Sequence, residues 1–425
     1  MKQLDLPQVT ANTFPGLPTW LAALKLAALS RFQELGYPTR DDEEWRFTDI
    51  RPIVSTAFTS PAQTTIEISQ LADLALSGTH HILIVDGVVK QSAPSDSRIV
   101  NGLKISNLAQ ALGEDAISLP LGRYAGFERN VFTAQNTANF EDCLVIQISR
   151  NAVIEEPLHI IYVSTARDFP TISFPRTLVI AGESSQVTLI ETWVTLGEAV
   201  TFANSVTEFI LAENANVDHY KVNQTANGSF HISTTQIQQA SSSSFSSNSF
   251  ILSGQIVRND INAVHAGEGI SSTLNGLSLA DGIRIIDNHT SIDHATPNCE
   301  SHELYKYILD DKSKGVFNGK IFVREDAQKT DAKQTNKTLL LSDDAQIDTK
   351  PQLEIYADDV KCTHGATIGQ LDDKQLFYLR SRGISLEDAK SLLVYAFAGE
   401  LINKVKVDLL KERLDAHLLS KLPQK

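Results

Sequence analysis

The chain has 425 residues, of which 42% are hydrophobic and 21% are charged, proportions that are ordinary for a globular protein with a sizeable core. Its 37 basic and 51 acidic side chains give a formal net charge of −14. An acidic chain repels phosphate backbones and anionic lipid, so we expect no nucleic-acid binding and no membrane association.

The chain contains three cysteines, Cys143, Cys299 and Cys362, which lie far apart in the sequence. So few cysteines, in an odd number, argue against a disulfide framework and favour a reducing compartment. We therefore expect a cytoplasmic protein, and an organelle such as a plastid is left open. We also expect no secretory signal and no apolar run of membrane-spanning length.

The first predicted element is a helix over residues 17–36, where apolar side chains recur close to the 3.6-residue period. Gly36, followed closely by Pro38, marks its end. The next stretch, residues 40–48, is highly charged and carries Trp45. The sequence leaves two interpretations of it open: a surface loop with an aromatic anchor, or a functional segment.

A hairpin is predicted where the apolar runs 82–85 and 88–89 flank Asp86-Gly87. Together with the helix before it, this gives an N-terminal domain of helical and mixed structure over residues 1–140.

Residues 141–372 change in character, because short alternating runs rich in Val, Ile, Thr, Ser and Asn replace helical periodicity. A loose repeat of turn and strand places Val187, Val217, Phe245 and Ile270 at intervals of 30, 28 and 25 residues. A period of this size is typical of stacked coils that bury their inner side chains against one another. We therefore predict a mainly β protein whose core is a β-helix.

The last part, residues 373–425, returns to helical periodicity as a C-terminal helical domain. Ser385 begins a capping-box-like start, and apolar residues then share one face of a first helix; Leu410, Leu414 and Leu418 share one face of a second. Two interpretations remain open: a helix pair that caps the solenoid, or a module that binds a partner.

Most motifs that would carry chemistry are missing from the sequence. The segment Gly315-Val-Phe-Asn-Gly319-Lys320-Ile321 fails as a phosphate-binding loop, because only three residues separate the glycines and Ile follows the Lys. We therefore expect no nucleotide site in this chain.

One short stretch contains four possible metal ligands, His289, His294, Cys299 and His302, but their spacing matches no standard metal site. Turn and core roles are favoured for them over a ligand role.

Cys362 and His364 form a more informative pair. In a strand, residues two apart point to the same face, so a thiol and an imidazole would lie side by side as iron or sulfide ligands. Lys361 beside them is expected to favour the thiolate. Spacing alone makes this a weak signal, because a cysteine in a core is usually only a small apolar residue.

The sequence around this pair closely resembles the signature of the SufB/SufD family of iron–sulfur cluster assembly proteins. The few cysteines, and the Gly-Ala-Thr that follows His364, favour the SufD branch of that family. The segments that carry the resemblance are Glu43–Thr48, Tyr305-Lys306, Gly315–Lys320, Asp326–Ala332, Leu339–Ile355, Ala357–Thr367 and Phe377–Ile384.

The resemblance implies a right-handed parallel β-helix between helical ends, acting as a non-catalytic scaffold subunit. The helices at residues 385–420 would dock on the ATPase SufC, and the last coils of the β-helix would pair with SufB. A nascent iron–sulfur cluster, transient and shared with SufB, would form at that interface. His364 would be the first candidate from this chain and Cys362 the second, and the nucleotide would bind to SufC rather than to this chain.

Two other functions remain as alternatives. One is a purely structural solenoid in which Cys362 and His364 only pack. The other is a β-helix enzyme acting on acidic polysaccharide, which would need clustered carboxylates and bound calcium; the acidic charge argues against it. Self-association of the isolated chain through exposed strand edges is also left open.

Overall fold

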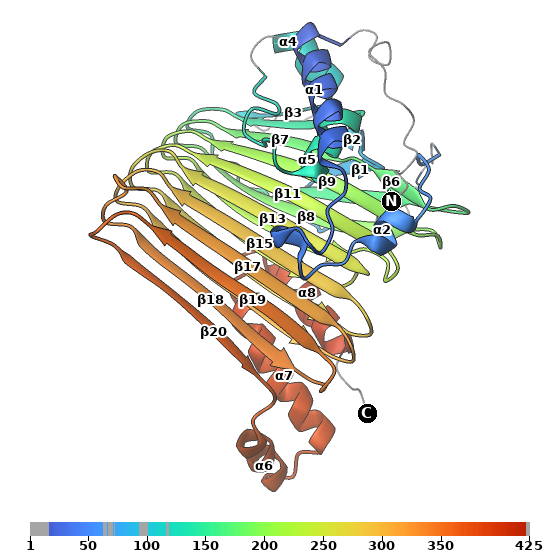
Figure 1. Cartoon of the computed structure of the whole chain (residues 1–425), viewed down its shortest axis with the longest axis vertical. Coiled ribbons are helices and arrows are strands. Elements are labelled where there is room, and N and C mark those ends of the chain that lie inside the picture. The colour runs from blue at the N-terminus through green and yellow to red at the C-terminus, as the bar shows by residue number, and fades with distance from the viewer. Residues whose placement is uncertain are drawn as a thin grey trace.

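The computed structural model describes residues 17–62, 66, 71, 73–92, 101–115 and 119–421. It is dominated by a stack of parallel strands that forms a flattened solenoid, with further elements at its start and helices along one side (Figure 1). The predicted parallel β-helix with helical ends is therefore confirmed. Within the described residues, no helix is both long enough and apolar enough to span a membrane.

Two sheets of ten strands each face one another across the core of the described chain. Sheet 1 has the order β2-β1-β5-β8-β10-β12-β14-β16-β18-β20; sheet 2 has the order β3-β4-β7-β9-β11-β13-β15-β17-β19, with β6 pairing β9. From β7 onward the chain crosses between the sheets at each turn, so every coil contributes one strand to each. The strands are β1 (His80–Val85), β2 (Val88–Ser92), β3 (Leu103–Ser106), β4 (Leu144–Ile148), β5 (Leu158–Thr165), β6 (Thr171–Ser173), β7 (Arg176–Ala181), β8 (Gln186–Leu196), β9 (Thr201–Leu211), β10 (Asn216–Gln224), β11 (Phe230–Gln239), β12 (Ser244–Ile251), β13 (Ile256–His265), β14 (Ser271–Ala280), β15 (Ile285–His294), β16 (Glu300–Leu309), β17 (Lys314–Val323), β18 (Asp331–Leu340), β19 (Gln346–Ile355) and β20 (Lys361–Gly369).

The side chains that face the core stack in columns from coil to coil. Val187, Val217 and Phe245 occupy equivalent positions on β8, β10 and β12, as the repeat predicted. The prediction that Ile270 occupies the next equivalent position was wrong, because Phe245 pairs with Ser272 on β14. Ile270 is fully buried in the turn before β14, so its burial resembles that of a strand residue although its position differs.

One edge of the solenoid is built from turns that share a left-handed residue. Ser184, Asn214 and Ser242 have φ of 56°, 57° and 57°, a conformation that short polar side chains tolerate better than most. The main-chain N–H of Asn214 donates to the carbonyl of Ser241 in the next coil at 3.0 Å. Such bonds continue the ladder through the turns and help to keep successive coils in register.

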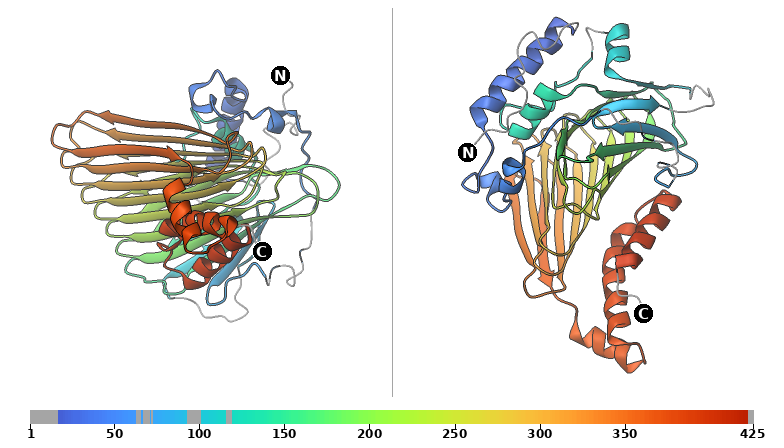
Figure 2. Two further views of the ribbon diagram at one scale, coloured as in Figure 1. Left: turned by 90° about the horizontal axis from the view of Figure 1, so that it is seen from below. Right: turned by 90° about the vertical axis from the view of Figure 1, so that its right-hand side faces the viewer.

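The N-terminal elements cover the beginning of the solenoid and the outer face of sheet 2 (Figure 2). The predicted first helix is confirmed as α1 (Thr19–Leu35), with Gly36 at φ 62° after its last turn. The predicted hairpin is confirmed as β1 and β2, an antiparallel pair. Other described helical elements of this region are the 3₁₀ turn η2 (Glu43–Trp45), α2 (Arg51–Ser55), α4 (Leu108–Asp115) and α5 (Val131–Asn139).

The C-terminal region forms three helices, α6 (Asp373–Ser381), α7 (Leu386–Ile402) and α8 (Asp408–Lys421). The hydroxyl of Ser385 accepts a hydrogen bond from the N–H of Asp388 and so caps α7, as the sequence predicted. Helices α7 and α8 pack their apolar side chains on the outer face of sheet 1, whereas α6 buries none of its residues. Figures 1 and 2 show α6 projecting past the last coil.

Candidate functional site

Cys362 and His364 lie on β20, the final strand of sheet 1, at the open end of the solenoid (Figure 1). Their register partners on β18 are Ala332 and Gln334, which are both buried. Strand residues two apart share a face, so Cys362 and His364 extend into the last coil the two columns of inward-facing side chains to which Ala332 and Gln334 belong. The structure therefore brings the predicted site residues to the same face of one strand.

The Cys362 side chain is half-buried against a small apolar cluster that includes Ile321 and Ala332. Burial raises the pKa of its thiol, and the nearby Asp331 carboxylate adds to the rise. Lys361 lies on the opposite face of the strand and is exposed. The expected activation of the thiolate by this lysine was therefore wrong, and the neutral thiol is favoured.

His364 is exposed because no further coil of the described chain covers it. In the coil beneath it, the Gln334 amide nitrogen donates to Oε2 of Glu303 at 2.7 Å. The same carboxylate oxygen accepts the hydroxyl of Thr290, on the opposite sheet, at 3.1 Å. By register, His364 on β20, Gln334 on β18 and Glu303 on β16 form one column that ends at the open face.

Glu303 is a buried carboxyl group that the sequence analysis did not single out. Its side chain is enclosed in the solenoid, and burial raises its pKa to about 7, although the hydrogen bonds from Gln334 and Thr290 work against that rise. The sequence signal was weak, because Glu303 and Gln334 are 31 residues apart and meet only when the register of the coils is known.

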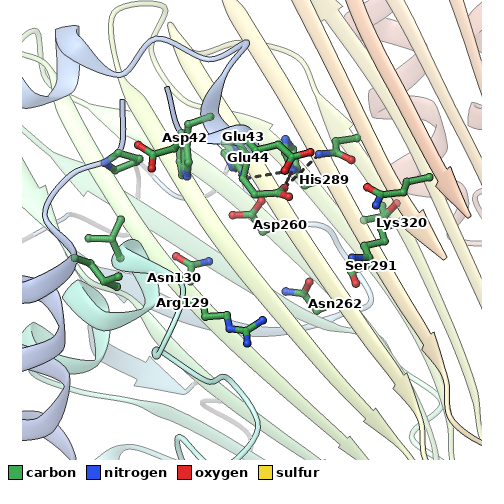
Figure 3. A pocket seen from close by; sticks show the side chains of 18 of the residues that line it. Asp42, Glu43, Glu44, Arg129, Asn130, Asp260, Asn262, His289, Ser291 and Lys320 are labelled. Carbon is green, nitrogen blue, oxygen red and sulfur yellow. Dashed lines mark hydrogen bonds and ion pairs between the residues drawn. The ribbon is translucent and has the colours of Figure 1, made fainter. Parts of the chain in front are cut away.

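A second hollow lies on the outer face of sheet 2, where the N-terminal segment crosses it (Figure 3). It encloses about 490 Å³ and is lined mainly by polar side chains, among them Glu44, Asp260, His289 and Lys320. Figure 3 shows Glu44 pointing toward His289 from the N-terminal segment. The two side chains lie 3.3 Å apart as an ion pair.

Beneath this hollow lies a network of buried charges. Arg258 contacts Asp287 at 3.0 Å, and Thr48 donates to the same carboxylate at 2.6 Å. Burial favours the neutral form of Asp287, but His289 and Arg258 outweigh burial and hold the pKa of this carboxyl near 2. Burial also lowers the pKa of His289, but Asp287 and Glu44 outweigh it, so the pKa of His289 is raised overall. Trp45 is buried beside these groups. The charged segment at residues 40–48 is therefore anchored on sheet 2, where Glu44 pairs with His289 and Glu43 pairs with Lys350.

His289, His294, Cys299 and His302 do not gather into one site, and His294 and Cys299 have the buried core and turn positions that the sequence favoured. His289 belongs to the network just described, and His294 is in the core, 2.9 Å from the hydroxyl of Ser301. Cys299 is buried in a turn with its sulfur on the carbonyl of Gly267 at 3.3 Å. Across the described residues, no three His, Cys, Asp or Glu side chains are gathered so as to hold a metal ion.

Comparisons with known proteins identify the family of the chain. The SufBD core domain of the SUF system for FeS cluster assembly matches residues 162–397, and the SufBD protein N-terminal region matches residues 15–160. An iron–sulfur cluster assembly SufBD family protein of Synechocystis is 32% identical over 396 residues, covering 89% of this chain and 86% of the relative. The iron–sulfur cluster assembly protein SufD of Escherichia coli is 33% identical over 399 residues, covering 93% and 92%. A chloroplastic protein of Arabidopsis thaliana is 30% identical over 380 residues, covering 87% and 79%.

Proposed function

Because the chain belongs to the SufBD family of iron–sulfur cluster assembly proteins, we propose that it is a non-catalytic scaffold subunit of a SufBCD-type complex. In this role it helps to assemble clusters and pass them to apo-proteins. The observation that carries the proposal is the open last coil. There, two unpaired strand edges and the Cys362–His364 pair are presented together.

The partner at the open end is a SufB-like subunit. Among the described strands, β19 and β20 each have a neighbour on one side only, so their free N–H and C=O groups are available to strands of another chain. Exposed apolar side chains support a protein contact here: Ile355 is 39% and Ile368 is 48% exposed. The same edges would support a homodimer when the partner is absent.

The partner at the C-terminal helices is a SufC-like ATPase, which supplies the nucleotide chemistry. Within residues 385–420, Leu386 and Leu392 on α7 are 41% and 49% exposed. Phe377 and Tyr378 on α6 extend this surface and are 75% and 57% exposed. Apolar side chains gathered on a projecting element are typical of a protein interface.

The nascent cluster is cargo, shared with the SufB-like subunit at the interface. His364 is its first ligand from this chain because it is exposed at the open end, and an imidazole is a good ligand for iron. Cys362 is the second. A packing role for Cys362 is a competing candidate, which its half-burial and the raised pKa of its thiol favour. The whole complex is assigned to the cytoplasm, or to a plastid as for the chloroplastic relative.

Three units would serve these roles: residues 1–140, residues 141–372 and residues 373–425. The first would cover the start of the solenoid, the second would carry the cluster site, and the third would bind the ATPase.

Co-purification and cluster reconstitution test the proposal. The tagged chain should retain both a SufB-like subunit and a SufC-like ATPase, and failure to retain either one would contradict it. His364→Ala should lower the cluster yield of the assembled complex without changing its subunit composition. A normal yield would remove His364 from the site. Cys362→Ala, compared with Cys362→Ser, decides whether the sulfur binds iron or only fills space.

A further inference from the structure

The column beneath His364 contains two buried polar atoms for which the described residues offer no partner, Oε1 of Glu303 and, nearer to His364, Oε1 of Gln334. Oε1 of Gln334 is buried and makes no hydrogen bond within the described part of the chain, whereas Nε2 of the same amide donates to Glu303 at 2.7 Å. Nearly all buried polar atoms in proteins are paired, and an unpaired acceptor destabilises the fold. An unpaired acceptor next to a proposed ligand therefore calls for a functional explanation.

We propose that Gln334 is a positioning residue for His364: its amide oxygen accepts a hydrogen bond from one ring N–H of the imidazole. The inference rests on the proposed function, because it assigns the other ring nitrogen to iron at the partner interface. Gln334 is the register partner of His364 on the adjacent strand, and the two side chains share the inner face. The His364 ring covers this acceptor when it turns inward.

The orientation of the Gln334 amide is fixed from below. Oε2 of Glu303 accepts from both Thr290 and Gln334, and it can do so whether the carboxyl is ionised or carries a proton on its other oxygen. The amide nitrogen is therefore directed toward Glu303, which leaves the amide oxygen to accept. Glu303 thus acts on His364 only through Gln334.

Gly319 on β17 makes room for this arrangement. A Cβ at that position would lie 2.1 Å from Nε2 of Gln334, so any other residue would push the amide away from its place. The glycine that failed as part of a phosphate-binding loop thus has a steric role inside the solenoid, directly below the proposed site.

A neutral imidazole has one N–H donor and one lone pair. When Gln334 accepts the N–H, the tautomer is fixed and the lone pair on the other nitrogen is available to iron. Histidine ligands of metals commonly donate their second ring nitrogen in this way, and loss of such a partner lowers metal affinity or activity by roughly 10–100-fold.

Two variants separate the hydrogen bond from general packing. Gln334→Met keeps a similar length but replaces the amide oxygen with a thioether sulfur, which is only a weak acceptor. Gly319→Ala leaves the Gln334 amide chemically intact but displaces it. This variant therefore tests the proposal even if Gln334→Met does not fold. The matched control is Asn336→Leu, a buried polar residue on the same strand in the next inner column, whose register partner on β20 is Ala366.

The first measurement is the tautomer of His364 in the full-length chain labelled with ¹⁵N-histidine, with the signal assigned by its loss in His364→Ala. The wild type and Asn336→Leu should show one neutral tautomer, and Gln334→Met and Gly319→Ala should show a mixture. The second measurement is the initial rate of cluster formation by the complete complex. It should fall roughly tenfold or more in both test variants and stay unchanged in the control.

An unchanged tautomer and an unchanged rate in Gln334→Met overturn the inference, provided that His364→Ala still lowers the rate. If His364→Ala leaves the rate normal, the proposed function of His364 fails instead. The tautomer measurement alone then decides whether the hydrogen bond to Gln334 exists.

Discussion

The guanidinium of Arg258 lies over the indole of Trp45, with 3.8 Å between its central carbon and the ring centroid. It also donates to the main-chain carbonyl of Glu44 at 2.7 Å and pairs with Asp287. One side chain on β13 therefore holds the N-terminal segment onto sheet 2 by stacking, by a hydrogen bond and by charge.

Replacing Arg258 with Met should release this segment and destabilise the chain. The change leaves Asp287 buried without its guanidinium partner, and breaking a buried pair in this way costs about 3–5 kcal/mol. Urea unfolding should show the loss, and limited proteolysis should show new cleavage within residues 36–50. Arg129→Met, an exposed arginine on the same hollow, should change neither result; equal effects in both variants would contradict the role of Arg258.

The buried carboxyl of Glu303 should make stability depend on pH. Its pKa in the folded chain is about 7, above the ordinary 4.5 of a glutamate carboxyl, so the folded state binds the proton more tightly than the unfolded state does. This contribution is fully present below about pH 4.5 and is lost as the pH rises through 7, by about 3 kcal/mol in total. Glu303→Gln should therefore become more stable relative to wild type between pH 5 and pH 8. A difference in unfolding free energy that stays constant over this range would contradict the assignment.

The facing histidines His265 and His294 should have the opposite effect. Their Nδ1 atoms lie 3.2 Å apart in the core, and burial lowers the pKa of His294 to about 4 and that of His265 well below its usual value. Their contribution to stability is present above about pH 6.5 and is lost as the pH falls through the lowered pKa values, by about 3 kcal/mol for His294. Thermal unfolding between pH 7 and pH 4 should show a smaller loss in His294→Gln than in wild type.

The three thiols should differ sharply in reactivity. Cys143 and Cys299 are fully buried, whereas Cys362 is only half-buried. A maleimide should therefore modify Cys362 first in the folded chain, and the rate should still be rising at pH 8 because the pKa of that thiol is raised. Mass spectrometry of the tryptic peptides identifies the site; early labelling of Cys299 would mean that its turn opens.

Phe377→Ala should weaken binding of the SufC-like ATPase and leave the fold unchanged, because α6 buries none of its own residues. Removing an aromatic side chain from the core of an interface commonly costs 2 kcal/mol or more, roughly a 30-fold change in Kd. Calorimetry with the purified ATPase measures the change. The control is Phe169→Ala, a phenylalanine between β5 and β6 that is 69% exposed, which should bind like wild type.

The stacking of the coils could be predicted from the sequence where turns of equal length recur. Turns of four residues precede both β10 and β12, so the positions predicted for Val217 and Phe245 from the repeat were correct. The prediction failed at Ile270, because the turn before β14 has five residues and ends with a buried apolar side chain. Turn length shifts the register, and an apolar corner residue cannot be distinguished from a strand residue by its type.

The candidate site was predictable only in part. Two-residue alternation along one strand was enough to put Cys362 and His364 on one face. The amide and carboxyl beneath them could not be found in this way, because each comes from a different coil and their contact depends on the register between strands. For the same reason, closeness in sequence does not bring His289, Cys299 and His302 together in the fold. In a solenoid, side chains that are close in the sequence can point in different directions, whereas residues about 30 positions apart lie side by side in successive coils.

The projecting helix α6 is tied closely to the last strand. Strand β20 ends at Gly369 and α6 begins at Asp373, so the connection is three residues, which reach about 10 Å when fully extended. A linker this short has almost no slack. Any partner that pulls α6 farther than this reach must also strain β20 or lift α7 from sheet 1, so mechanical work done on the helix reaches the strand that carries His364.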